Sequence, residues 1–240
     1  MKKINLLIIA LLFTGIVSAQ QNFIGLAMGG SIPVGDYAAT TEASQTGYAL
    51  SGFSLNFIGD YYFMKILGIG ATATFGMNGT DEQELQDDWI NYLENLHDVT
   101  IPPDADVRFI TTQWTYVNLF VGPVISFPLK RISFELKAQG GMSFITPPKR
   151  DIYITYDGDE ITSSSSGSNV AFGYLLGAGI QFRPNDTYGI RVGADYFASE
   201  AKLNLEQRID EGLEKGNIVT EVWKMPVQTY HVTLGINYFF

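Results

Sequence analysis

Apolar residues alternate with small or polar residues along several long stretches of this chain. The clearest stretch is the last one, where every second residue is apolar or aromatic: Tyr230, Val232, Leu234, Ile236, Tyr238 and Phe240. The same alternation runs through residues 66–78 and 169–182. A period of two residues is that of a β-strand, because successive side chains of a strand point to opposite faces of its sheet.

Eight segments of this kind follow one another along the chain. They cover residues 22–33, 48–63, 66–78, 109–128, 131–145, 169–182, 187–203 and 220–240. Three connections are short: Met64-Lys65, Leu129-Lys130 and Arg183 to Asp186. Four are long: residues 34–47, 79–108, 146–168 and 204–219. Because bacterial outer-membrane barrels have an even number of strands, short periplasmic turns and long extracellular loops, the pattern predicts an all-β, eight-stranded antiparallel up-and-down β-barrel.

The composition of the polar face distinguishes a barrel in a membrane from a barrel in water. A barrel in water would carry many Lys and Glu residues on that face, but here it is mostly Gly, Ser, Thr, Asn and Gln. The apolar face places aromatic residues near the short turns: Tyr61, Phe63, Phe127, Phe182, Tyr188, Tyr238 and Phe240. Such a girdle is expected at a membrane interface. We therefore expect a transmembrane barrel; a soluble lipocalin-like ligand-binding barrel is the alternative, since both kinds alternate.

The N-terminus predicts export. Lys2 and Lys3 precede an apolar stretch, and Val17 and Ala19 are the small residues that a signal peptidase needs at its cleavage site. We expect a signal peptide at residues 1–19 and a single barrel domain at residues 20–240. The net charge is −10 and becomes more negative without the two lysines, which argues against nucleic acid as a partner. Cysteine is absent, which excludes disulfides and thiolate chemistry.

The end of the chain resembles a known signal. Gly235-Ile236-Asn237-Tyr238-Phe239-Phe240 looks like the C-terminal motif by which outer-membrane barrels are recognised for insertion. The segments Gly29 to Tyr37 and Gly59 to Lys65 are similar to the first strand and first periplasmic turn of small OmpA/PorT-like outer-membrane barrels. The resemblance implies a bacterial outer-membrane location, contact with outer-membrane lipid, and recognition of Tyr238 and Phe240 by the barrel-insertion machinery. It implies no particular activity.

Five charged residues fall on the inward face of the predicted barrel. They are Asp60, Glu135, Lys137, Arg191 and Asp195. Three of them, Asp60, Glu135 and Arg191, lie three or four residues from a periplasmic turn and so share a depth. We expect a buried salt-bridge network, because an unpaired charge there would be costly and these signs can neutralise one another. A gated ion path is the alternative, although an eight-stranded interior is just wide enough for side chains to fill.

Candidate catalytic residues are few. His231 falls on the inward face of the last strand, beside the strand that carries Asp195. A lipid-modifying hydrolase would need a Ser, a His and an acid within hydrogen-bond reach, and no Ser stands out as the third member. His97 lies in a long loop without Cys or a second His nearby, so it makes a poor zinc site. We expect no enzyme activity, no metal and no cofactor.

The second long loop holds most of the charge imbalance. From Asp81 to Arg108 the only Lys or Arg residue is Arg108, whereas nine residues carry a carboxylate: Asp81, Glu82, Glu84, Asp87, Asp88, Glu94, Asp98, Asp104 and Asp106. Apolar residues recur there at helical spacing: Leu85, Trp89, Leu93 and Leu96. Thr80 and Gln83 match a capping box, so a short amphipathic helix is expected above the barrel mouth. Its apolar stripe either packs on neighbouring loops or forms a surface for a protein partner or, through the carboxylates, a divalent cation.

Two local features complete the prediction. Asp151 to Tyr156, Asp157-Gly158-Asp159 and Ile161 predict a hairpin that rises beyond the membrane. Pro123 lies in the middle of a strand without a free edge, so a bulge is expected there. Taken together, we expect a non-enzymatic outer-membrane protein with a structural, adhesive or partner-docking role, which includes a part in a secretion or envelope assembly. A lipid-modifying enzyme and a soluble ligand-binding barrel remain the alternatives.

Overall fold

The computed structural model describes residues 22–41, 46–97, 106–156, 159–166, 169–210 and 217–240. The signal peptide expected at residues 1–19 lies outside these residues. Within them, no helix is long and apolar enough to cross a membrane.

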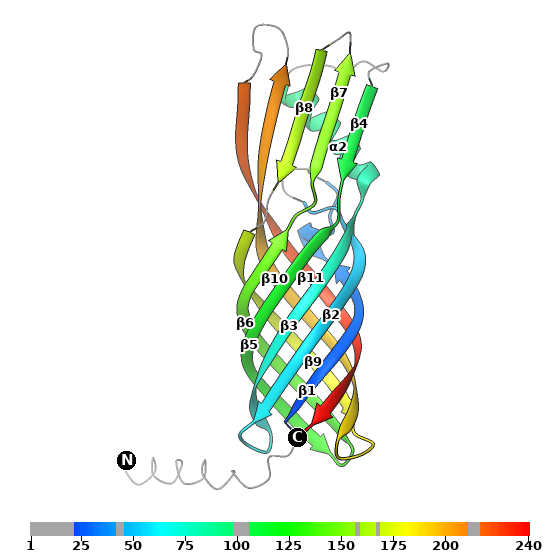
Figure 1. Cartoon of the computed structure of the whole chain (residues 1–240), viewed down its shortest axis with the longest axis vertical. Helices are drawn as coiled ribbons and strands as arrows, with labels where there is room; N and C mark the ends of the chain where they lie inside the picture. The colour runs from blue at the N-terminus through cyan, green and yellow to red at the C-terminus, as the bar shows by residue number, and fades with distance from the viewer. Residues whose placement is uncertain (1–21, 42–45, 98–105, 157–158, 167–168, 211–216) are drawn as a thin grey trace, which may run out of the picture.

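Eight antiparallel strands form a closed ring (Figure 1). In ring order they are β1 (Phe23–Pro33), β2 (Ala49–Tyr62), β3 (Leu67–Thr80), β5 (Trp114–Leu129), β6 (Ile132–Thr146), β9 (Asn169–Phe182), β10 (Tyr188–Asp210) and β11 (Asn217–Phe239). The ring closes because β11 pairs with both β10 and β1. The eight-stranded antiparallel barrel predicted from the alternation is confirmed.

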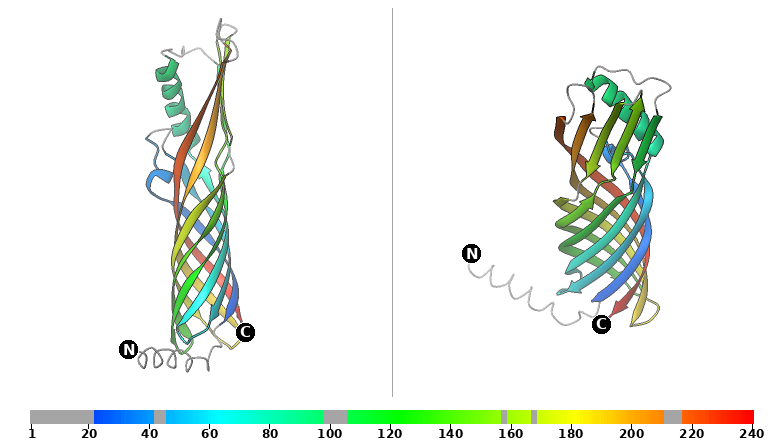
Figure 2. Two further views of the ribbon diagram at one scale, coloured as in Figure 1. Left: turned by 90° about the vertical axis from the view of Figure 1, so that its left-hand side faces the viewer. Right: turned by 45° about the horizontal axis from the view of Figure 1, so that its top comes forward.

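A second, smaller sheet stands on one end of the barrel. The strands β10 and β11 continue past the ring, and β8 (Asp159–Ser166), β7 (Arg150–Tyr156) and β4 (Asp106–Thr111) pair beside them in that order. We call this region, with Asn204–Asp210 of β10 and its paired stretch of β11, the outer sheet. The helix α2 (Glu82–His97) and the short helix η2 (Gly35–Tyr37) lie at the same end of the barrel (Figure 2). The short turns lie at the opposite end, near the C-terminus (Figure 1).

The outer sheet corrects two predicted boundaries. The strand expected at 109–128 is two strands, since β4 ends at Thr111 in the outer sheet and β5 begins at Trp114 in the ring. The loop expected at 204–219 consists largely of the continued β10 and β11. At β4 the alternation runs on beyond the barrel, because one face of this strand is partly covered and the other is exposed. The predicted hairpin is confirmed, with Ile154 opposite Ile161.

Two finer predictions are wrong. The pairing of β5 with β6 skips Pro123, which has no N–H to donate, but Val121 opposite Gly140 and Val124 opposite Lys137 keep one register, so there is no bulge. The helix α2 is capped by Asp81 and not by a Thr80 capping box. The backbone N–H of Glu84 donates to the Asp81 carboxylate at 3.4 Å, and the Thr80 hydroxyl donates to the carbonyl oxygen of Thr112.

The apolar face of the ring points outward. Ile236 and Leu234 are 65% and 59% exposed, and the aromatic residues expected near the short turns are all exposed as well. The polar residues of the same strands, such as Asn118 and Thr233, are buried inside. This is the arrangement of a membrane barrel, so the soluble lipocalin-like alternative is wrong.

The interior of the barrel is filled in three layers. Near the short turns lies an apolar cluster: Phe23, Ala27, Ile58, Tyr62, Val124 and Phe239. Above it lies the layer that contains the buried charges. At the other end the mouth is closed by a larger cluster, the mouth core: Tyr37, Tyr48, Ala49, Leu85, Trp89, Trp114, Tyr116, Phe120, Ile145, Ile154, Leu175, Phe197, Ala201, Met225 and Val227. Side chains therefore occupy the barrel from end to end.

Candidate functional site

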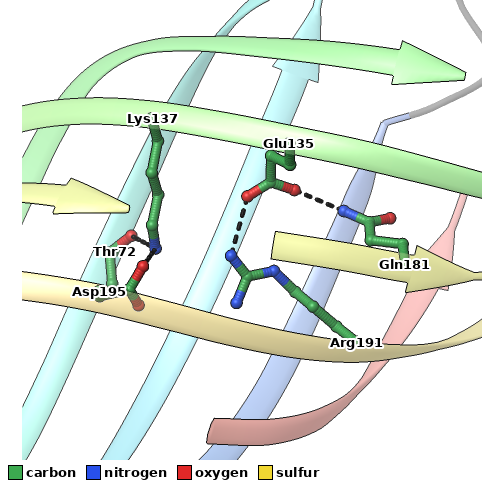
Figure 3. A network of polar contacts seen from close by, with 6 residues as sticks. All are labelled: Thr72, Glu135, Lys137, Gln181, Arg191 and Asp195. Carbon is green, nitrogen blue, oxygen red and sulfur yellow. Dashed lines mark hydrogen bonds and ion pairs between the residues drawn. The ribbon is translucent and has the colours of Figure 1, made fainter. Parts of the chain in front are cut away.

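The structure brings four of the five predicted lumenal charges together in two ion pairs (Figure 3). Arg191 Nη2 lies 3.0 Å from Glu135 Oε1, and Lys137 Nζ lies 3.2 Å from Asp195 Oδ1. All four side chains are buried. Gln181 also donates to the second oxygen of Glu135 at 2.5 Å. The carboxylate of Glu135 therefore has a charged donor on one oxygen and a neutral donor on the other.

Asp60 is placed differently from the other four. Its side chain is buried near Gln139 on the same inner face, but among the ion pairs of the described residues none includes Asp60. Its strand, β2, is three strands away from both β6 and β10 around the ring, and its side chain reaches toward Gln139 of β6 without joining either ion pair. The prediction of a shared depth did not determine which side of the lumen each charge occupies.

Glycines on the inner face make room for the charges. A Cβ atom at Gly177 would lie 2.1 Å from Asp195 Oδ1 and 2.5 Å from Lys137 Cε, which is too close for any real side chain. At Gly179 and Gly193 the same atom would meet the Arg191 guanidinium at 2.8 Å and 2.3 Å. The missing side chains on β9 and β10 thus form the space in which the two ion pairs lie.

The histidine predicted to be lumenal is part of a second polar group. His231 is opposite Asp195 in the β10–β11 pairing, and its Nε2 lies 2.7 Å from the Tyr116 hydroxyl. That hydroxyl in turn lies 2.9 Å from the hydroxyl of Ser31. Ser31 also donates to Asn78. The sequence did not single out Ser31, whose only signal is its inward parity on β1.

Helix α2 is held on the barrel by its apolar residues. Leu85 and Trp89, which were candidates for an exposed partner surface, are fully buried in the mouth core. They cannot present apolar surface to a partner, because they cover the aromatic side chains at the barrel mouth; the alternative of packing on neighbouring loops is correct for these two residues. Leu93 and Leu96 lie in the same helix, but their side chains are outside the described residues.

Polar contacts fix the helix and the loops around the mouth core. The Tyr48 hydroxyl donates to the Asp88 carboxylate of α2. Burial, followed by this hydrogen bond, raises the pKa of Tyr48 above its ordinary value. The guanidinium of Arg150, at the start of β7, is buried over the Tyr48 ring at 5.9 Å and donates to the carbonyl oxygen of Thr46. Burial lowers the pKa of Arg150 to about 10, so the side chain stays charged at neutral pH.

The outer sheet presents one exposed edge region. The outward side chains of β4 are Asp106, Arg108 and Ile110, and with Tyr153 and Thr155 of β7 they line a hollow of about 450 Å³. Val107 and Phe109, which alternate with them, pack toward the mouth core. One face of β4 is therefore covered and the other is open.

Two remaining candidates are placed as follows. Tyr238 and Phe240 are exposed on the outside of the barrel at the short-turn end, and their role as an insertion signal stays a prediction. Among the side chains that the structure describes, no group of three or more His, Asp or Glu is arranged to hold a metal ion. The side chain of His97 is outside that set.

Comparison with known proteins gives one family. The pattern described as "Outer membrane protein beta-barrel domain" matches residues 6–239. No curated relative matches the chain.

Solved structures with a similar fold include three outer-membrane proteins. The attachment invasion locus protein Ail of Yersinia pestis is 16% identical, with a TM-score of 0.42 over 93% of this chain and 100% of that one. Neisserial surface protein A is 11% identical (TM-score 0.44, 93% and 99% covered), and the outer membrane protease OmpT of Escherichia coli is 10% identical (0.46, 93% and 99%). Likenesses at this level carry no information on the role of this chain.

Proposed function

Because the chain belongs to the outer membrane protein beta-barrel domain family and lies in the bacterial outer membrane, we propose that it is a non-enzymatic surface protein that docks a partner through its outer sheet. The observation that carries the proposal is the outer sheet itself. Eight strands already close the ring, so β4, β7 and β8 add nothing to its closure. They hold a surface outside the membrane on a rigid base, which is where recognition by barrels and other scaffolds usually resides.

The exposed face of β4 is the best candidate for contact with the partner. Arg108 and Asp106 place opposite charges side by side, and Ile110 adds an apolar contact at the end of the same strand. Since β4 is the last strand of the sheet among the described residues, its outer edge also offers backbone groups to an added strand. These features favour docking of a polypeptide over binding of a small molecule.

The filled lumen argues against transport. The two apolar clusters cover the charged layer from both ends, and the charges themselves are paired across the space that an ion would need. We expect purified protein in planar bilayers to show no steady conductance. A reproducible ohmic conductance, lost on Arg191 substitution, would favour the ion path instead.

The geometry around His231 argues against hydrolysis. A serine nucleophile must touch its base, but the Tyr116 hydroxyl lies between Ser31 and His231. Both residues are also buried beneath the mouth core, so a lipid ester would have no path to the serine. We infer that these residues form a structural hydrogen-bond network.

Site-specific photo-cross-linking in growing cells tests the docking role. A photoreactive residue in place of Ile110 is expected to give one discrete protein adduct, whereas the same residue at Leu234, on the lipid face, or at Gln83, on the exposed side of α2, is not. Arg108→Glu should weaken the adduct formed from position 110. Equal adducts from all three positions, or none from position 110 in correctly folded protein, would contradict the proposal.

A further inference from the structure

A hollow lies on the outside of the barrel, in the face that meets lipid. It measures about 810 Å³ and extends from the start of β10 across β11, β1, β2 and β3 to β5. Its outward lining is entirely apolar or aromatic: Tyr188, Tyr238, Ile236, Ile24, Leu26, Phe57, Gly59, Ala71, Ala73, Leu119 and Val121. We call it the lipid-face groove.

Three small residues make the floor of the groove. Gly59 on β2 is opposite Ala71 on β3, and Ala73 follows two residues later on the same face. Large side chains surround them, among them Ile24 and Phe57, which are more than half exposed. The space above Gly59 is open, because a Cβ atom there would have only Ile24 Cγ2 nearby, at 3.9 Å.

The groove runs from the periplasmic rim toward the middle of the membrane. At one end it includes Tyr188, the first residue of β10, beside Tyr238, and at the other it includes Val121, about halfway along β5. The residues across it are neighbours in register, from Tyr238 to Ile24, Gly59, Ala71 and Val121. Because strands of such barrels are tilted, this row rises as it passes from strand to strand.

A basic residue lies below the floor. The turn that joins β2 to β3 contains Lys65, which is exposed, and no acidic residue occurs in that turn from Phe63 to Ile66. Tyr61, near the end of β2, and Phe63, the first residue of this turn, are exposed on the outside of the barrel at the level of the membrane interface. A phosphate at the interface would therefore be within reach of Lys65 while an acyl chain above it entered the groove.

We propose that the lipid-face groove is a specific binding site for one phospholipid of the periplasmic leaflet, with an acyl chain over Gly59, Ala71 and Ala73 and its phosphate at Lys65. The floor is only as wide as these small residues, which suits a single flexible chain better than the convex wall of a second barrel. The depth of the floor in the membrane also matches the periplasmic leaflet, since the floor lies a few residues above the aromatic girdle at the short-turn end. Bound lipid would anchor the barrel at a fixed rotation in the membrane.

Native mass spectrometry of the delipidated, folded protein tests this site. The protein is titrated in detergent with phosphatidylglycerol or phosphatidylethanolamine, and Gly59→Leu is compared with Gly30→Leu. Both positions face lipid, and no heavy atom lies within 4 Å of a Cβ atom at Gly30. Filling the groove should weaken the affinity for the first bound lipid molecule by about tenfold, while the Gly30→Leu control should bind lipid like the wild type. Ala71→Leu should repeat the effect, and unboiled gel mobility verifies that each variant is folded.

A second set of variants tests the phosphate contact at Lys65. Lys65→Gln should weaken phosphatidylglycerol by about fivefold, the loss expected for one lysine near an anionic surface. Lys130→Gln, in another short turn, is the matched control and should change neither lipid. Equal binding by the wild type and Gly59→Leu would overturn the site. Loss of a dimer mass in Gly59→Leu, without loss of lipid, would assign the groove to a second copy of the chain and also overturn it.

Discussion

One strand carries ion pairs into two very different environments. Inside the lumen, β10 supplies Arg191 and Asp195. Arg191 pairs with Glu135 and Asp195 pairs with Lys137, and no more than 1% of any of these side chains is exposed. Just beyond the ring, the same strand supplies Glu200, which lies 3.7 Å from Lys224 on β11, with 54% and 64% of the two side chains exposed. The chemistry of the pairs is alike, but water reaches only one of them.

The difference shows what holds each region together. A buried charge that loses its partner must pay the full cost of its lost hydration, so the lumenal pairs are mutually dependent. An exposed pair exchanges with water and contributes little. The outer region should depend instead on the mouth core, where Leu85, Trp89 and the aromatic side chains of the ring are packed away from water.

Removing one lumenal charge should have the largest effect. Arg191→Met leaves Glu135 buried with only the neutral Gln181 as donor, so we expect the barrel to lose about 3–5 kcal/mol of stability. The measurement is the temperature at which unboiled samples lose their folded mobility on a detergent gel, supported by urea unfolding in lipid vesicles. Arg108→Met makes the same chemical change in the outer sheet and should leave that temperature unchanged.

A double variant tests whether the charge is the cause. Adding Glu135→Gln to Arg191→Met removes the unpaired carboxylate and should restore part of the lost stability. An Arg191→Met barrel that melts like the wild type would mean that the lumen admits enough water to screen these charges, and the contrast between the two regions would disappear.

The outer region should respond to packing instead. Leu85→Ala opens space beside Trp89 in the mouth core, and such truncations cost about 2–5 kcal/mol when the site cannot collapse. We expect the amides of α2 to exchange hydrogen faster while the melting of the barrel barely changes. Gln83→Ala, on the exposed side of the same helix, is the control. An equal loss of stability in α2 and in the barrel would show that the mouth core and the barrel unfold as one unit.

The sequence predicted the ring well because alternation is a local signal. Each barrel strand buries one face and exposes the other to lipid, so period two appears in every strand and the short turns separate them. The same signal could not distinguish the ring from the outer sheet. Residues 106–111 alternate like barrel residues because Val107 and Phe109 pack on the mouth core, although β4 pairs with β7 and lies outside the ring.

The sequence predicted which charged residues lie inside the barrel, but it did not predict which of them form ion pairs. The alternation of side chains along each strand is enough to place Asp60, Glu135 and Arg191 inside the barrel. Which of them meet depends on strand order around the ring and on the glycines that leave space, and neither is visible in one strand. Ser31 was missed for the same reason, since its contact with Tyr116 crosses 85 residues of sequence. Leu85 and Trp89 were correctly recognised as lying on one apolar face of α2, but periodicity does not say whether such a face is covered.

The glycines beside the charges should also be more sensitive than glycines elsewhere. Gly177→Ala puts a methyl group against Asp195 and Lys137, and overpacking of this kind costs about 1–3 kcal/mol. Gly30→Ala, on the lipid face with nothing within 4 Å, should change stability by less than about 0.5 kcal/mol. The same melting assay compares the two. If both variants melt alike, the lumenal pairs have room to shift, and the glycines are not what positions them.

The exposed pair should show the smallest effect, and salt makes that effect diagnostic. Lys224→Met removes one partner of Glu200 and should lower stability by less than about 0.5 kcal/mol, since both groups remain hydrated. Raising the salt concentration to about 1 M shortens the screening length to about 3 Å, which should abolish even this difference. The penalty of Arg191→Met should persist at the same salt concentration, because ions in solution do not reach a buried pair. A penalty of Lys224→Met that also persisted would mean that salt does not screen this pair, and the contrast with the lumenal pairs would disappear.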